Sequence, residues 1–410
     1  MNKMEVFQDG VPSRSRGLML DKNRQVLIAV LLGFFIQALV AQLDNKLILV
    51  VQFFLVLLVA AIQFRSKSRL VAMFVAIIVW GTCTVFNYLY VDPIGTPDAY
   101  RYWAYYLDYA SDPGVYMQSI LNEVLSSKLY DVSSYSIIAA VCYPIINILF
   151  SADVFAGFSV LNFTFAMLTF WLGISIAAKS PKNEAALKLA FFLWLLSPVV
   201  ILHYQTFTKD IISTFLCVAC VRAVLNRNFL FAVFVFVIAT MLRPYAIAIV
   251  FCIYNVVAVR NRELYLGLIA SAALVVIFAG SAGVVNMLIT AGYMPLSPNF
   301  FAGIKRQEYF LLYVESFITF LAFMFVAVAC VKTDYLRVYV LPLLSAIFIY
   351  SAVMVLLGRY STDYHGEDYG AGSMGNNALR KKIPVLFLFF YLIASAFYYF
   401  KINRGSVRQS

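Results

Sequence analysis

The sequence predicts an all-α membrane protein, a single polytopic helix bundle over residues 1–410 with about twelve transmembrane helices. Of the 410 residues, 63% are hydrophobic and only 12% are charged, whereas about a quarter of the residues in a typical soluble domain are charged. Apolar runs of roughly 17–25 residues, the length a helix needs to cross a bilayer, recur along nearly the whole chain. These observations exclude a water-soluble globular fold.

The apolar runs place the predicted spans in chain order. They are 25–43, 46–64, 70–90, 153–178, 187–204, 211–226, 229–242, 245–258, 264–289, 309–331, 338–357 and 383–400. A further apolar run, 136–150, is short and contains Pro144, so its length alone does not decide whether it crosses. The distribution of basic residues decides it.

Most lysine and arginine residues fall in loops that share one side of the membrane if 136–150 does not cross. These loops include the basic N-terminal segment, 65–69, 179–188 and the C-terminal tail. If 136–150 crossed, every later basic loop would lie outside, against the positive-inside rule. The sequence therefore predicts a re-entrant or interfacial helical segment at 136–150 and two cytoplasmic termini. Basic loops that contact anionic headgroups also explain the net charge of +11, so no nucleic-acid partner is expected.

The sequence contains no motif for a cofactor or a metal. The six cysteines lie within or beside apolar runs, which favours small core residues over metal or redox roles. Cys217 and Cys220 form a C-x-x-C pair, but no second pair accompanies them. A P-loop, a dinucleotide fingerprint, a zinc motif and a nucleophile elbow are all absent from the sequence. We therefore expect no cofactor and no metal site.

The longest predicted outer loop, 91–135, contains two helix starts and many aromatic residues. Asp98 begins the first helix, where its carboxylate can cap free backbone N–H groups. Arg101, Tyr102 and Trp103 follow in a segment rich in tyrosine. One interpretation is an aromatic belt in the membrane interface, and the other is a platform on which sugar rings stack. The two interpretations are compatible.

Further charged residues lie at the outer ends of predicted spans. Lys209 and Asp210 begin the sixth span, and Arg243 lies where the seventh span meets the eighth. Arg359 leads from the eleventh span into a second outer loop that contains His365. Each residue alone could be a helix cap, a headgroup contact or a solvated loop residue. Together they favour a functional site, because charge near the membrane core is costly. Cations suit a lipid-linked phosphate or pyrophosphate, and a carboxylate or imidazole suits removal of a hydroxyl proton.

Three segments of the chain resemble a pattern in bacterial surface-polysaccharide polymerases. They are TPDAYRYWAYY, SPVVILHYQTFTKDIISTF and LRPYAIAIV, and Arg359 and Gly370 add the spacing R-x10-G. In these features the chain is similar to the Wzy-type O-antigen polymerases and the EpsG-like proteins, which are integral-membrane glycosyltransferases. The resemblance covers about residues 90–255. The family's largest outer loop often falls in the second half of the chain, whereas here the longest is 91–135.

The resemblance implies polymerisation of lipid-linked oligosaccharide repeat units at the periplasmic face of the bacterial inner membrane. The growing glycan would pass from undecaprenyl pyrophosphate to an acceptor repeat unit, with inversion and without a metal. The two outer loops, 91–135 and 358–382, would then be periplasmic. The candidate substrate-binding residues are Arg101, Tyr102, Trp103, Lys209, Arg243, Tyr245 and Arg359, and the candidate catalytic residues are Asp98, His365 and Asp210.

Two alternatives stay open at the level of sequence. Another polyprenyl-phosphate-dependent glycosyltransferase or an O-antigen ligase would use the same residues with a different acceptor. A non-enzymatic polysaccharide transporter or flippase would instead show broken helices and buried charges near mid-membrane. The partners that the resemblance implies are the lipid-linked oligosaccharide, the bilayer and, as a further candidate, a chain-length regulator protein.

Overall fold

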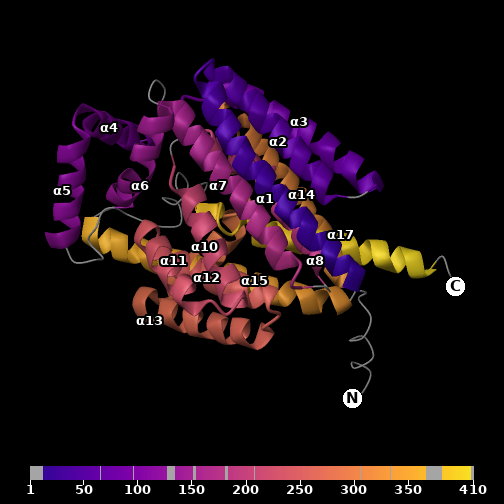
Figure 1. The fold of residues 1–410 in the computed structure, drawn as a ribbon. Helices are drawn as coiled ribbons and strands as arrows, with labels where there is room; N and C mark the ends of the chain where they lie inside the picture. Colours follow the sequence, from indigo (N-terminus) through magenta and orange to yellow (C-terminus); the bar gives the residue numbers. More distant parts are fainter. Residues whose placement is uncertain are drawn as a thin grey trace.

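Helices form the regular secondary structure of the chain (Figure 1). The computed structural model describes residues 13–64, 66–95, 97–126, 134–150, 154–180, 183–206, 208–304, 306–332, 334–365 and 381–407. Within these ranges no strand occurs, so the predicted all-α fold is confirmed.

The first three helices pack side by side along one flank of the bundle (Figure 1). They are α1 (Ser13–Ala41), α2 (Asn45–Gln63) and α3 (Ser66–Tyr90). The turn between α1 and α2 is closed by Asp44, whose side chain accepts a hydrogen bond of 2.8 Å from the Lys46 N–H. An aspartate at this position satisfies one of the N–H groups that the start of a helix leaves open.

The next three helices form a separate group at one end of the bundle (Figure 1). They are α4 (Pro97–Ser111), α5 (Pro113–Ser126) and α6 (Ser134–Leu149). Both helix starts predicted in the long outer loop are present, and Asp112 caps α5 by accepting a bond of 3.0 Å from the Val115 N–H. The buried faces of the group carry tyrosines that pack on α6 and α7, among them Tyr102, Tyr106 and Tyr143.

The centre of the bundle is built from α7 (Val154–Ala177), α8 (Glu184–Leu195), α9 (Pro198–Tyr204) and α10 (Asp210–Leu225). The predicted span 187–204 is not one straight helix. It is divided into α8 and α9, which meet at an angle of 54°. Pro198 explains the break, because a proline cannot donate the helical hydrogen bond and disfavours helical backbone in the residue before it.

The remaining helices follow α10 in the chain. They are α11 (Phe229–Leu242), α12 (Ala246–Val257), α13 (Asn261–Tyr293), α14 (Phe310–Lys332), α15 (Asp334–His365) and α17 (Leu386–Val407), with 3-10 turns at Phe300–Ala302 and Gln307–Tyr309. α13 packs along α15 (Figure 1). Within α13 the backbone leaves the helical conformation at Gly280, where φ is 62° and ψ is −163°. Only glycine adopts that combination readily, so Gly280 sets the kink of this helix.

Seven helices of the described residues are long and apolar enough to cross a membrane, or eight if the bent pair α8 and α9 counts as one span. Four further apolar helices, α6, α11, α12 and α17, contain shorter stretches of 10–17 residues. The polytopic helix bundle is therefore confirmed. The count of twelve transmembrane spans remains a prediction. So does the assignment of 136–150, which forms most of α6, as a segment that does not cross the membrane.

Large apolar side chains cover the outer surface of the bundle. Leu230 and Phe234 on α11 and Ile277 and Phe278 on α13 are each more than 60% exposed. By contrast, 78% of the apolar window of α7 is buried, against 17% of that of α13. Such a surface is unfavourable in water but matches hydrocarbon. α7 is thus an interior helix of a membrane protein, and α13 lies at its lipid-facing edge.

Where α7 packs on α8, Gly173 leaves no room for a larger side chain. A Cβ atom on Gly173 would overlap the ring of Phe191, and that ring is stacked on Phe387 of α17 at 4.3 Å between centroids. We expect Gly173→Ala to lower the free energy of unfolding by about 1–3 kcal/mol, measured as a lower Tm in detergent. Gly81→Ala is the matched control, because no neighbouring atom lies within 4 Å of its Cβ position. Equal stability of the two variants would contradict this packing.

The membrane topology is tested by labelling single cysteines. Asp92 and Arg262 are both exposed, and the predicted topology places Asp92 outside and Arg262 in the cytoplasm. A membrane-impermeant maleimide should label Asp92→Cys on intact cells but label Arg262→Cys only after permeabilisation, with the parent protein as background. Labelling of Arg262→Cys on intact cells would mean that 136–150 crosses the membrane.

Candidate functional site

The polar loop between α9 and α10 is held by helices that lie far away in the sequence. The Gln205 side chain donates to the Thr84 hydroxyl at 2.9 Å and accepts from the Asn87 amide at 2.8 Å, both on α3. The Asn162 amide on α7 donates to the Thr206 carbonyl at 3.0 Å. The Asn162 bond satisfies a backbone carbonyl that the unwound segment would otherwise leave unpaired, and the other two satisfy the polar side chain of Gln205. They also fix the position at which α10 begins.

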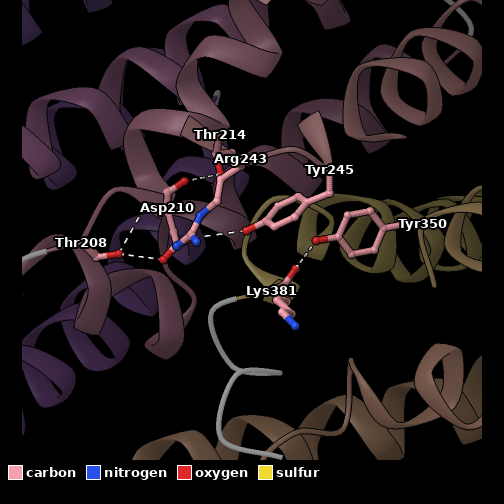
Figure 2. A network of polar contacts seen from close by, with 7 residues as sticks. All are labelled: Thr208, Asp210, Thr214, Arg243, Tyr245, Tyr350 and Lys381. Carbon is pink, nitrogen blue, oxygen red and sulfur yellow. Dashed lines mark hydrogen bonds and ion pairs between the residues drawn. The ribbon is translucent and has the colours of Figure 1, made fainter. Parts of the chain in front are cut away.

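Asp210, the first residue of α10, is fully buried and is the centre of a polar network (Figure 2). Its Oδ1 atom lies 2.5 Å from Arg243 Nη2 and accepts from the Tyr245 hydroxyl at 3.4 Å. Its Oδ2 atom accepts from the Thr208 hydroxyl at 2.8 Å. The backbone carbonyl of Asp210 accepts from the Thr214 hydroxyl at 2.8 Å. A carboxylate with this set of partners is tightly oriented.

Arg243 ends α11 with extended backbone, φ −146° and ψ 113°, and Pro244 follows at the predicted turn into α12. Its side chain is 18% exposed and its Nε is buried without a hydrogen-bond partner among the described residues. The guanidinium carbon lies 5.9 Å from the centre of the Tyr245 ring. Asp210 therefore orients the guanidinium through Nη2, and the exposed part of the side chain is where an anion could meet its remaining donors.

The charge state of Arg243 follows from two opposing effects. Burial lowers the pKa of Arg243, but the adjacent Asp210 carboxylate outweighs burial and raises that pKa above its ordinary value. Arg243 is a permanent cation at any pH at which the protein is folded.

Lys209 and Tyr102 join the α4–α6 group to this network. Lys209 is 8% exposed, and its Nζ lies 4.8 Å above the ring of Tyr135 on α6. The Tyr135 ring in turn lies 4.8 Å from that of Tyr102 on α4. A second cation is thus placed one residue before Asp210, over an aromatic face that stabilises its charge.

Tyr245 and Tyr350 extend the network toward the end of the second outer loop (Figure 2). The two rings meet edge to face, with centroids 5.9 Å apart. The Tyr350 hydroxyl on α15 donates to the Lys381 carbonyl at 2.6 Å. The network therefore joins residues from α10, α12, α15 and the segment that follows 366–380.

The structure brings four of the predicted site residues into one region. Asp210, Arg243 and Tyr245 share direct contacts, and Lys209 adjoins them in the chain. Asp210 was predicted as a catalytic residue. That role stays a prediction: the structure shows its side chain fully buried and bonded to Arg243, Thr208 and Tyr245.

The three neighbouring residues predicted on α4 do not share one environment. Tyr102 is 1% exposed and its backbone carbonyl accepts from the Tyr143 hydroxyl at 2.8 Å, so its ring is part of the core and not a free stacking platform. Trp103 is half-buried, with its ring 5.7 Å from that of Tyr100, and Arg101 is exposed. Arg101 and Trp103 stay available to a ligand at the surface.

Three other predicted residues cannot be placed at atomic detail. Asp98 lies in the first turn of α4, and Arg359 and His365 lie in the last turns of α15, but their side chains are outside the described residues. The part of the second outer loop at 366–380, including Gly370, is outside them as well. The identity of the general base therefore stays a prediction.

Sequence reasoning missed a second buried polar cluster. Glu315 on α14 is 6% exposed and lies 3.4 Å from Nζ of Lys382, which is 0% exposed. The Ser197 hydroxyl, at the break between α8 and α9, donates to the other oxygen of Glu315. A lone glutamate inside the apolar run LLYVESFITF was the available signal, since an acidic residue within a span is costly and usually paired.

The Asp210–Arg243 contact predicts a large coupling energy. Asp210→Ala should lower the free energy of unfolding by about 3–5 kcal/mol, because it leaves a largely buried guanidinium without its counter-charge. The double variant Asp210→Ala/Arg243→Met should be less destabilised than the sum of the single variants by about 1–3 kcal/mol. Thermal unfolding in detergent measures both quantities.

A pair on the surface provides the control for this cycle. Arg260 and Glu263 lie 4.0 Å apart, but their side chains are 52% and 45% exposed. Their cycle should give a coupling energy below about 0.5 kcal/mol, since solvent screens an exposed pair. If the Asp210–Arg243 cycle gave an equally small value, the pair would not hold the site together.

Comparison with protein-family models, with curated proteins and with solved structures finds no match in any of the three. Function has therefore to be argued from the site, whose chemistry consists of an oriented arginine, a buried lysine and an aromatic surround at the ends of apolar helices.

Proposed function

We propose that this protein is a membrane glycosyltransferase that polymerises lipid-linked oligosaccharide repeat units at the periplasmic face of the bacterial inner membrane. Its donor would be a glycan on undecaprenyl pyrophosphate, and its acceptor a second lipid-linked repeat unit. A chain-length regulator protein is a candidate partner, and both termini would be cytoplasmic. The proposal joins the motif resemblance to the chemistry of the Asp210–Arg243 site.

The single observation that carries the proposal is the orientation of Arg243. Asp210 holds Nη2 of the guanidinium, and 18% of the Arg243 side chain stays exposed and open to an anion. An arginine that presents donors in a fork suits the oxygens of a phosphate, which it binds through two parallel hydrogen bonds. Lys209 adds a second buried cation beside Asp210. Phosphate linked to a lipid is the anion that such a site would meet at the edge of a bilayer.

The proposed reaction is a direct displacement at the anomeric carbon of the donor. The oxygen of the acceptor hydroxyl forms the new glycosidic bond as the bond to pyrophosphate breaks, and the configuration inverts. A base, for which Asp98 and His365 are the candidates, takes the hydroxyl proton. Pyrophosphate leaves with the electron pair, and Arg243, Lys209 and Arg359 stabilise its charge, so the reaction needs no metal.

A second candidate function has an observation of its own. The break between α8 and α9 and the buried Glu315–Lys382 pair are the broken helix and intramembrane charges typical of transporters. A non-enzymatic polysaccharide transporter or flippase would use them to move lipid-linked glycans. The two functions differ in the phenotype of a strain lacking the protein. Loss of a polymerase leaves single repeat units on the periplasmic side, whereas loss of a flippase leaves them on the cytoplasmic side.

Replacement of Arg243 by lysine tests whether the guanidinium binds phosphate through two parallel hydrogen bonds. Arg243→Lys keeps the charge but cannot bind phosphate through two parallel hydrogen bonds, so we expect at least about a tenfold loss of polymer. The measurement is the ladder of surface glycan in a deletion strain complemented with the variant, at matched expression in the membrane.

Arg260→Lys is the matched control, because Arg260 is exposed and pairs only weakly with Glu263. It should restore the full ladder. A full ladder from Arg243→Lys as well would leave Arg243 as a headgroup anchor and remove the main support for the proposal.

A further inference from the structure

The chain re-enters the bundle after the second outer loop through residues 381–384, here called the return segment. Lys382 is its most deeply buried charge. The Lys382 ammonium donates to the Ser297 carbonyl at 2.7 Å and lies 3.4 Å from Glu315 Oε2. An ion pair in a low-dielectric interior is costly to form, and it persists only where further hydrogen bonds complete it. Here the Ser297 carbonyl supplies one of them.

The return segment is also bound by the helices that flank the α8–α9 break. The Trp194 indole on α8 donates to the Ile383 carbonyl at 2.9 Å. The Ser197 hydroxyl, at the break, donates to Glu315. Glu315 thus accepts from both Ser197 and Lys382. Elements that are far apart in the sequence, α8 and α14, hold the return segment from two sides.

A chain of contacts leads from the return segment to Arg243 (Figure 2). The Lys381 carbonyl accepts from the Tyr350 hydroxyl at 2.6 Å. The Tyr350 ring packs edge to face on that of Tyr245. The Tyr245 hydroxyl donates to Asp210, which holds Arg243. Because Tyr350 and Tyr245 are buried, a shift of the Lys381 carbonyl would leave the Tyr350 hydroxyl without this acceptor and alter the packing on Tyr245.

We propose that Lys382 is a positioning residue for the Arg243 site. Its pair with Glu315 fixes the return segment, the return segment fixes Tyr350, and Tyr350 sets the orientation of Tyr245 on Asp210. The position at which the second outer loop ends is thereby coupled to the orientation of the arginine fork. The consequence for glycan transfer rests on the proposed function, whereas the conformational coupling does not.

Hydrogen exchange on the full-length protein in nanodiscs tests the coupling without any activity assay. The variants are Tyr350→Phe, which removes one hydroxyl and keeps the ring, and Lys382→Met/Glu315→Gln, which removes both charges together. We expect each to raise exchange in 208–214 and 243–246 by about three- to tenfold, as for one lost buried hydrogen bond, with α7 unchanged. Combining them should add little, because both interrupt one chain of contacts.

Lys188→Met is the control, because it breaks the partly exposed Lys188–Glu184 pair, which takes no part in the contacts described between the return segment and Arg243. It should leave exchange at both site segments unchanged. Unchanged exchange in Tyr350→Phe and in the double variant would overturn the proposal, and so would an increase spread equally over α7, which indicates general loosening. If the double variant does not fold, Lys382→Met alone takes its place and should raise exchange at the same two segments; unchanged exchange there would overturn the role of Lys382.

Activity then separates this inference from the proposed function. Raised local exchange together with a shortened glycan ladder supports both. Raised local exchange with a normal ladder supports the positioning role of Lys382 and contradicts the role of Arg243 in glycan transfer.

Discussion

The ion pair between Asp210 and Arg243 is the contact on which the site depends. The Asp210 carboxylate lies in the first turn of α10, and the Arg243 guanidinium follows the last turn of α11. The two helices form a hairpin, so the two charges meet at its open end in a largely buried position. Neither charge is stable there alone. Their attraction therefore fixes how α10, α11 and α12 meet, and the hydroxyls of Thr208 and Tyr245 complete the coordination of the carboxylate.

The same requirement explains where the bundle departs from regular helix. Backbone carbonyls in two irregular segments are bound by side chains from other helices: Asn162 donates to the Thr206 carbonyl, and Trp194 donates to the Ile383 carbonyl. A bilayer offers no water for this purpose, so irregular backbone inside a membrane protein has to be enclosed by protein. Each enclosed segment is then held from several sides. A site that must present a charged group in a fixed direction needs this rigidity.

Much of the fold could be predicted from sequence, because apolar runs and prolines act locally. Helix starts at Pro97 and Pro113 followed from turn chemistry, and Lys209, Asp210 and Arg243 stood out as charges between apolar runs. The break at Pro198 was concealed by the continuous apolar run around it. The remaining contacts depend on which helices pack together across long stretches of intervening chain, and periodicity carries no information about that. Tyr350 and Lys382 were missed for this reason, and Tyr102 was assigned to a surface although its ring faces the core.

The helices around Arg243 are short. α10 has 16 residues, α11 has 14 and α12 has 12, and a helix of 12 residues is about 18 Å long against a hydrocarbon core of about 30 Å. With the other ends of α11 and α12 at the cytoplasmic surface, as the charge distribution predicts, Arg243 lies well below the level of the outer headgroups. The bilayer has to thin or admit water at this point of the perimeter. A lipid whose headgroup descends into that depression would reach the guanidinium without drawing its tail out of the membrane.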